Sequence, residues 1–236
     1  MISVPIETTP RSGAANMAAD AAMLDAAANG VAAGRWYRWT EATVSLGHFQ
    51  EETDLDCVVP PDLPLVRRLS GGGAIVHHHE WTYALAVPRG HALAARPEQF
   101  YEAVHGELIA ALGTSGVAAR LRGERPTEGP DPALCFRRSD PRDVVITDAD
   151  GVERKIVGSA QRRRKGAVLQ HGSLLITASP YAPHVPGLRE TQGITDARAA
   201  AIVRDAAVRF GRLLTAGSAS GPFGGPSLID DLPKPL

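Results

Sequence analysis

The chain has 236 residues, of which 44% are hydrophobic and 22% charged, and its formal net charge is −1. This length suits one large domain or two small ones and can bury a sizeable core. The near-neutral charge and the 5% of aromatic residues argue against a protein that binds nucleic acid through a basic surface or a stacking platform.

The cysteines and the first residues give no sign of export or of membrane insertion. Cys57 and Cys135 form no Cys-x-x-Cys pair, so a zinc ribbon is not predicted. The N-terminal residues lack a basic stretch followed by an apolar run, and no segment reaches the ~18 apolar residues that would span a bilayer. We therefore expect a cytoplasmic monomer with reduced thiols that contacts neither membrane nor nucleic acid.

The hydrophobic pattern predicts more strands than helices. Met17, Leu24 and Ala28 fall at helical spacing and predict a first helix, which Ser12 or Asn16 can cap. Helices are predicted over residues 16–29, 97–112 and 196–214. Strands are predicted over residues 35–49 (two strands around a turn), 63–69, 82–87, 142–147, 152–158 and 167–177.

Hairpins join several of these strands, as Asp150-Gly151 indicates. No glycine fingerprint of a dinucleotide fold or of a P-loop is present. The pattern predicts a single α+β domain over residues 1–214, with a mixed β-sheet flanked by helices, followed by a Gly/Pro-rich tail over residues 215–236.

A run of three glycines follows the strand predicted at residues 63–69. It begins after Ser70, and its missing side chains would let a ligand touch the backbone and its N–H groups. Arg67 and Arg68 precede it, and strand alternation would place only one of them in a pocket. The same run is also typical of a flexible turn with solvated arginines.

Three consecutive histidines come next. On a strand His77 and His79 would share one face, with Glu80 pointing the other way. A zinc site needs three or four protein ligands, and the sequence places no third one. No metal site is therefore predicted, and we expect one histidine to line a pocket.

Lys155 is one of only three lysines in the chain and lies on a predicted strand. Alternation would place Glu153, Lys155 and Val157 on one face of that strand. The small residues Gly158, Ser159 and Ala160 follow, where a ligand could approach the backbone. Lys155 is either an exposed surface residue or the cation of a ligand pocket, and the scarcity of lysine favours the second interpretation.

Residues 162–165 read Arg-Arg-Arg-Lys and are predicted to form a turn. Such a charged run is either a solvated turn or a docking surface for an acidic protein partner.

Together these segments resemble the catalytic domain shared by lipoate–protein ligases, octanoyltransferases and biotin–protein ligases. Residues 67–77 resemble Arg-Arg-x-Ser/Thr-Gly-Gly-Gly/Arg-Ala-Val-x-His, residues 155–160 resemble Lys-x-x-Gly-Ser-Ala, and residues 171–173 resemble His-Gly-Thr/Ser. The segments 16–20, 43–47 and 80–83 are similar as well, and the likeness runs from about residue 14 to about residue 214.

The resemblance implies an α+β fold with an acyl pocket. It also implies an acceptor, the specific lysine of a lipoyl domain such as the glycine-cleavage H protein or the E2 subunits of 2-oxoacid dehydrogenases. The candidate substrate-binding residues are Arg67, Arg68, Ser70, Gly71, Gly72, Gly73, His77, Gly158, Ser159, Ala160, His171 and Gly172.

The expected identity of the acyl donor depends on Cys135. Residues 132–136 resemble the Cys-Phe loop of the ligase-like octanoyltransferases, in which a cysteine is the acyl nucleophile and a lysine its partner. This likeness implies Cys135 and Lys155 as the catalytic residues, octanoyl acyl carrier protein as the donor, and no cofactor. Gly73, by contrast, matches the ligases, since these transferases often carry arginine there.

Three alternatives stay open at this point. An ATP-dependent lipoate–protein ligase would use free lipoate with ATP and Mg. An amidotransferase would move octanoyl from one lipoyl protein to another. A non-catalytic member of the family would bind an acylated carrier as a sensor or scaffold.

Overall fold

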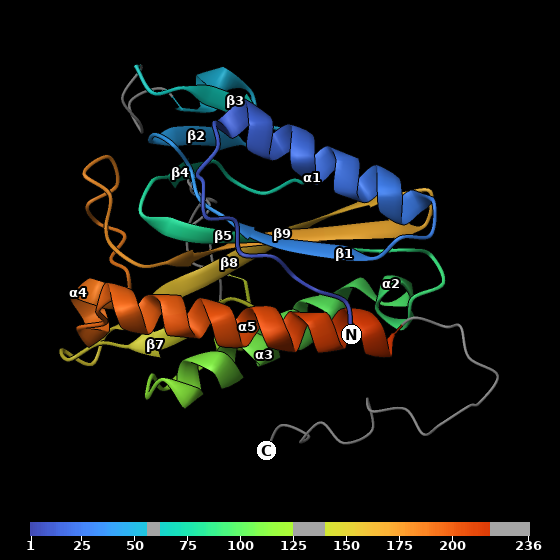
Figure 1. Ribbon diagram of the computed structural model, residues 1–236. Helices are drawn as coiled ribbons and strands as arrows, with labels where there is room; N and C mark the ends of the chain where they lie inside the picture. The colour runs from blue at the N-terminus through green and yellow to red at the C-terminus, as the bar shows by residue number, and fades with distance from the viewer. Residues whose placement is uncertain (56–61, 125–139, 218–236) are drawn as a thin grey trace.

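The computed structural model describes residues 1–55, 62–124 and 140–217 (Figure 1). Its helices are α1 (Gly13–Ala28), α2 (Ala92–Ala95), α3 (Pro97–Thr114), α4 (Leu188–Gln192) and α5 (Asp196–Ala216), with a 3-10 helix η1 at Glu52–Leu55. Its strands are β1 (Ala33–Tyr37), β2 (Thr43–Leu46), β3 (Leu65–Arg67), β4 (Ile75–His77), β5 (Glu80–Val87), β6 (Ala119–Leu121), β7 (Val144–Thr147), β8 (Glu153–Arg164) and β9 (Ala167–Leu175).

The strands form two sheets. A six-stranded sheet has the order β1-β5-β9-β8-β7-β6 with every pair antiparallel. A three-stranded sheet has the order β3-β2-β4, and its β2–β3 pair is parallel. Helix α1 covers one face of the large sheet, and α3 and α5 cover the other (Figure 1). The predicted α+β fold is confirmed, and among the named strands the one parallel pair, β2–β3, lies in the small sheet.

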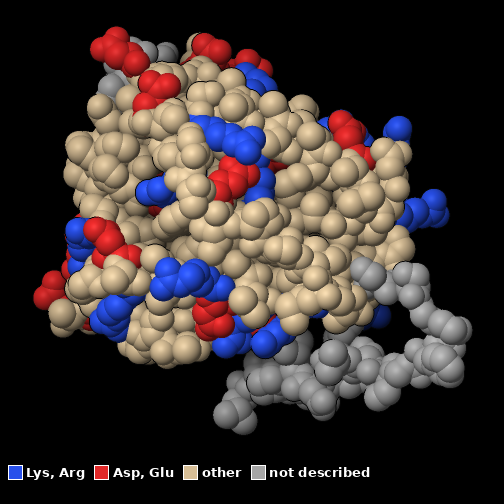
Figure 2. Space-filling model, viewed as in Figure 1, with Lys and Arg blue, Asp and Glu red and all other residues tan. Residues whose placement is uncertain are grey.

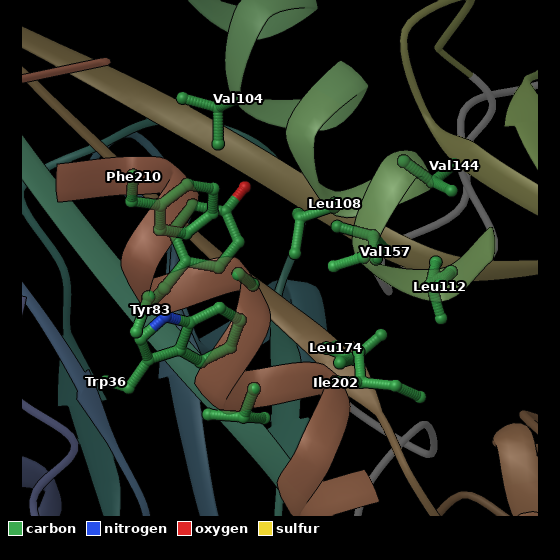
Figure 3. Packing of buried hydrophobic residues seen from close by; sticks show 14 of the residues in the cluster. Trp36, Tyr83, Val104, Leu108, Leu112, Val144, Val157, Leu174, Ile202 and Phe210 are labelled. Atoms are coloured by element: carbon green, nitrogen blue, oxygen red, sulfur yellow. The ribbon is translucent and has the colours of Figure 1, made fainter. Parts of the chain in front are cut away.

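The main hydrophobic core lies between the large sheet and helices α3 and α5 (Figure 3). Trp36 of β1 stacks on Phe210 of α5, with ring centroids 5.6 Å apart and planes 2° from parallel. Leu108 of α3 and Ile202 of α5 are fully buried beside them. Since a buried aromatic or aliphatic side chain contributes about 1.5–3 kcal/mol, this layer fixes the sheet on which the candidate site is built.

Several local predictions differ from the structure. Helix α1 begins at Gly13, because the side chain of Ser12 rather than Asn16 caps it. The two strands predicted in residues 35–49 exist, but they enter different sheets. Helix α3 continues through Gly113 to Thr114, and the short helix α2 was not predicted. Residues 162–164 are strand rather than turn, since β8 extends through them.

The β8–β9 hairpin closes at Lys165 and Gly166. Both have positive φ angles, 51° and 82°, as the central residues of a tight two-residue hairpin require. Strand β8 is therefore longer than the hydrophobic pattern predicts, and the basic residues lie along the end of the hairpin.

The charged residues form no field of a single sign on the face that Figure 2 shows. Lys and Arg lie among Asp and Glu there, separated by uncharged residues (Figure 2). Among the helices of the described residues, none is long and apolar enough to cross a membrane.

A buried histidine ties α3 to the sheet. His105 is 1% exposed, and its ring is hydrogen-bonded to the Arg142 carbonyl and, at 2.7 Å, to the Ser159 hydroxyl. Burial lowers the pKa of His105 to about 4, an effect that the nearby charge of Lys155 reinforces and the Arg142 carbonyl opposes. The ring is therefore neutral in the folded protein above this pH.

We expect His105 to make stability depend on pH. The unfolded chain binds a proton at the ordinary pKa of 6.5, whereas the folded chain binds it only near pH 4. The free energy of unfolding should fall by about 3 kcal/mol between these values as the pH decreases. Urea unfolding of His105→Gln should show a correspondingly smaller slope, whereas the exposed His184→Gln should keep the wild-type slope. Identical pH profiles for the wild type and His105→Gln would contradict the assignment.

Candidate functional site

Strand β8 carries an extra residue at the candidate lysine. Adjacent residues of β7 pair with Lys155 and Val157, so Ile156 has no partner of its own on β7. Such a β-bulge shifts the side-chain alternation, and Ile156 and Val157 both pack into the main core. The predicted shared face of Lys155 and Val157 is therefore wrong, and Lys155 instead shares a face with Gly158.

Lys155 forms a buried ion pair with Asp143. Its Nζ lies 2.9 Å from Asp143 Oδ1, and the two side chains are only 6% and 4% exposed. Burial raises the pKa of Asp143 above its usual value, and the charge and hydrogen bond of Lys155 act against this increase. A guanidinium nitrogen of Arg122 lies 3.4 Å from the second oxygen of Asp143. The ion pair holds a cation at one point of the sheet, where it could stabilise a thiolate or an oxyanion.

Gly158 makes room for this lysine. A Cβ atom at Gly158 would lie 2.7 Å from Cε and 3.0 Å from Nζ of Lys155, closer than real Cβ contacts. The lysine side chain therefore lies across the Gly158 backbone, which also borders the candidate ligand cavity. Small residues after Lys155 thus serve the packing of the lysine itself as well as the approach of a ligand.

A narrow cavity lies on the sheet face that α1 covers. Met17 of α1, Tyr37 and Trp39 provide part of its apolar wall. Its volume is about 20 Å³, room for roughly one water molecule, so an acyl chain could enter only as the lining side chains move apart. Seven of the candidate residues border it, namely Arg68, His77, Gly158, Ser159, Ala160, His171 and Gly172.

The glycine run is held by Arg68. This buried guanidinium donates to the carbonyl oxygens of Gly71 at 2.8 Å and of Gly73 at 2.6 Å. The Gly72 carbonyl packs against Gly47, where a Cβ atom would collide with it. Within the described part of the chain, no acceptor receives the N–H groups of residues 71–73. Residues 71–73 do not line the cavity. They form a turn whose carbonyl oxygens contact Arg68 and Gly47.

Arg67 and Arg68 separate as strand alternation predicts. Arg67 is exposed and donates to the backbone carbonyls of Gly47, at 3.2 Å, and Gln50. Arg68 is 3% exposed and borders the cavity. Arg67 thus holds the segment before the glycine run, whereas Arg68 is positioned to reach a ligand.

A chain of hydrogen bonds joins the glycine run to α1. Ser70 Oγ is bonded to His171 Nε2, and His171 Nδ1 lies 3.0 Å from Asp20 Oδ2. The Tyr37 hydroxyl donates to the same carboxylate at 3.1 Å. All four side chains are buried, so this serine–histidine–carboxylate chain fixes three segments that are far apart in sequence.

A second serine–histidine–carboxylate chain also borders the cavity, through Ser45 and His77. Ser45 Oγ is 2.8 Å from His77 Nε2, and His77 Nδ1 is bonded to Glu80 Oε1. Burial opposes ionisation of Glu80, but His77 and hydrogen bonds from His78 and Ser173 hold its pKa below its usual value. The expectation that Glu80 points away from His77 is wrong, because the turn at residues 78–79 folds Glu80 back onto the imidazole.

The neighbouring histidines do not assemble a metal site. His78 stacks on His79 with centroids 3.5 Å apart, and no group of three or more histidine, cysteine, aspartate or glutamate side chains within residues 1–55, 62–124 and 140–217 could hold an ion. His77 is engaged by Ser45 and Glu80 instead.

Ser159 and Cys135 differ from the other candidate residues. Ser159 borders the cavity, but its hydroxyl is bonded to His105 on the opposite side of the sheet. Cys135 lies outside the described residues, as does Cys57.

Sequence reasoning did not single out Asp20, Ser45 or Asp143. Asp20 follows Asn16 by one helical turn on an otherwise alanine-rich helix, and both are buried. A polar pair at that spacing on a helix face that must pack on a sheet is a signal that could have been used. Ser45 and Asp143 carry no comparable signal, because only the fold brings them to His77 and Lys155.

Comparison with known proteins agrees with these observations. The family model of the lipoyl protein ligase A/B catalytic domain matches residues 12–206. Octanoyltransferase LipM of Macrococcus caseolyticus is 37% identical over 174 residues, covering 68% of this chain and 60% of that protein. Octanoyltransferase LipM of Symbiobacterium thermophilum is 35% identical over 181 residues, covering 72% and 64%. The chain thus spans about three fifths of the length of these relatives.

Solved structures show the same fold at lower identity. Lipoate-protein ligase A bound with ATP superimposes with a TM-score of 0.65 at 19% identity, covering 89% of this chain and 85% of that one. A bi-partite lipoate protein ligase of Thermoplasma acidophilum, solved in a study with its E2 lipoyl domain, gives a TM-score of 0.59 at 20% identity, covering 89% and 84%. The motifs, the fold and the family model agree, and the chain belongs to the lipoyl protein ligase A/B catalytic domain family.

Proposed function

We propose that this protein is an octanoyltransferase, which takes the octanoyl group from a thioester of acyl carrier protein and transfers it to the specific lysine of a lipoyl domain. The relatives named octanoyltransferase LipM support this activity. The observation that carries it is the buried Lys155 cation beside an apolar cavity. Glycine-cleavage H protein and E2 subunits are the acceptors we expect, and no cofactor is required.

Cys135 is the proposed nucleophile. The described chain ends at Glu124 and resumes at Asp140, and both sides of this gap are tied to Asp143: its carbonyl accepts from Arg122 N–H at 2.9 Å, and its carboxylate accepts from Asp140 N–H at 3.0 Å. Cys135 precedes Asp140 by five residues, a length of chain that spans at most ~18 Å. The partner of Lys155 therefore lies at the base of the segment that carries the thiol.

The proposed reaction has two steps. The Cys135 thiolate, stabilised by the Lys155 ammonium, attacks the thioester carbonyl carbon; the carrier thiolate leaves and takes up the proton that Cys135 released. The amine of the acceptor lysine then attacks the acyl-enzyme, an amide forms, and the cysteine thiol is regenerated with a proton from that amine. The donor is already activated, so neither step consumes ATP.

The glycine run is the proposed oxyanion site. Arg68 holds two of its carbonyls and Gly47 packs on the third. No described residue accepts a hydrogen bond from its N–H groups, which we propose for the ligand. Fixed N–H donors stabilise the negative oxygen of a tetrahedral intermediate without reorganisation during the reaction. The backbone at Ser159 and Ala160 borders the cavity and is the alternative position for this role.

Replacing Cys135 should abolish the acyl-enzyme. After incubation with octanoyl acyl carrier protein, intact-mass and peptide mass spectrometry should locate one octanoyl group on Cys135. Cys135→Ala should carry no adduct and should octanoylate a lipoyl domain at less than about 1% of the wild-type rate, since two easier steps are then replaced by one. Cys57→Ala is the matched control and should retain both the adduct and the activity.

The same assay separates the alternatives. Wild-type protein is offered octanoyl acyl carrier protein, free octanoate or lipoate with ATP and Mg, and octanoyl H protein in parallel. Transfer from the free acid that survives Cys135→Ala would overturn the proposal in favour of a ligase. Transfer from octanoyl H protein alone would identify an amidotransferase, and binding without any transfer a non-catalytic member.

Lys155→Met should lower the rate of acylation by about 10²-fold or more near neutral pH, because the thiolate loses its cation. The deficit should shrink as the pH rises toward ~8.5, where an ordinary cysteine ionises unaided. Single-turnover acylation measured between pH 6 and 9 tests this. Arg204→Met removes an exposed cation from α5 and should change nothing. A deficit that is constant with pH would contradict the role assigned to Lys155.

A further inference from the structure

A second cleft adjoins the acyl cavity. It lies between β4 and the segment that follows β9, drawn in orange between β9 and α4 in Figure 1. Ile75 and Val76 form one wall, and Leu175, Ala182 and Val185 form the other. Its volume is about 30 Å³, and it is open at the surface, so it suits an extended chain lying across it better than a wide ring system.

The acyl cavity and the cleft share one lining side chain. Ile75 borders both the acyl cavity and this cleft. Glu80, which lines the cleft, is hydrogen-bonded to His77 and Ser173, and both of these residues border the acyl cavity. A molecule whose acyl end occupies the cavity would therefore continue past Ile75 into the cleft.

The cleft also has a strand edge that no described strand pairs with. Within residues 1–55, 62–124 and 140–217, strand β4 pairs only with β2. Val44, the partner of Val76 in the ladder, donates its N–H to Pro64 on the opposite side, toward β3. In an antiparallel ladder, two opposed residues either both point their N–H and C=O groups at each other or both point them away. Because Val44 points its N–H away from β4, Val76 points its N–H and C=O away from β2. Among the described residues, none hydrogen-bonds these two groups.

The charges around the cleft select against an anionic ligand. None of the described residues that line it is lysine or arginine, and its one carboxylate, Glu80, is engaged by His77. His79 is the other titratable side chain in the lining. Uncharged hydrogen-bonding groups on an extended chain match such a surface better than a phosphate does.

We propose that this cleft binds the leaving group of the acyl donor, a pantetheine-type arm whose secondary amides add to the free edge of β4 at Val76. This inference rests on the proposed thioester donor, and the cleft is the subsite for the thiol leaving group of that donor. The thioester then lies at Ile75, between the acyl chain in one hollow and the amides in the other. Backbone pairing supplies affinity for any chain with amides at this spacing.

Three octanoyl thioesters test the subsite: octanoyl pantetheine with two amides, octanoyl N-acetylcysteamine with one, and S-ethyl octanethioate with none. Transfer of octanoyl to a lipoyl domain is followed by mass spectrometry with the full chain. We expect kcat/KM to fall in that order, by about tenfold from the first to the last, because each hydrogen bond contributes a few-fold. Equal values for the three donors would overturn the inference while leaving the proposed transferase intact.

Filling the cleft provides the second measurement. Val185→Trp should lower kcat/KM for octanoyl pantetheine at least tenfold and leave S-ethyl octanethioate within twofold. Val208→Trp is the matched control, since Val208 is 48% exposed on α5 and far from both hollows in sequence and fold; it should affect neither donor.

The remaining outcomes distinguish a failure of the proposed subsite from a failure of the proposed octanoyltransferase function. An equal loss for both donors in Val185→Trp would place the effect on the acyl cavity and overturn the subsite. Loss of an ATP-dependent ligation in Val185→Trp would assign the cleft to a nucleotide, also against it. If the wild-type protein transfers octanoyl from none of the three thioesters nor from octanoyl acyl carrier protein, the proposed function itself fails.

Discussion

The buried pairing of Lys155 with Asp143 is the constraint around which the candidate site is arranged. Removing an ammonium and a carboxylate from water costs several kcal/mol each, and the pair is tolerated only with close geometry and further hydrogen bonds. The β-bulge at Ile156 turns Lys155 toward the cavity side, and Gly158 leaves space for its side chain. An irregular strand and a glycine, each unfavourable in an ordinary sheet, thus follow from the need to hold one cation in place.

The rest of the site is fixed by groups that also need partners when buried. Two serine–histidine–carboxylate chains border the cavity, one ending at Asp20 and the other at Glu80. Arg68 links them, since it donates to the Ser45 carbonyl and to the carbonyls of the glycine run. Because every member is buried, loss of one would leave the others unsatisfied, and the walls of the cavity behave as a single unit.

The sequence carried more information about the fold and the family than about the site. Helical spacing, hairpin residues and the glycine and lysine motifs were sufficient for the α+β class and for the family. Alternation failed at Lys155, since a bulge adds one residue that no local pattern marks. It failed again at Glu80, where a turn reverses the expected direction. The partners Asp20, Ser45 and Asp143 could not be predicted, because they contact their histidine or lysine only through long-range packing.

The fixed polar walls indicate how a ligand could enter so small a cavity. The charged and histidine side chains are each held by two or more bonds, so they are poorly suited to move. Met17 and Ile75 have no such bonds, and a methionine adapts its three rotatable bonds to the available space. An unbranched apolar chain needs only a narrow slot between such side chains, whereas a branched or polar one would have to displace the hydrogen-bonded walls. The division between rigid polar walls and adaptable apolar ones therefore favours an unbranched apolar chain over a branched or polar one.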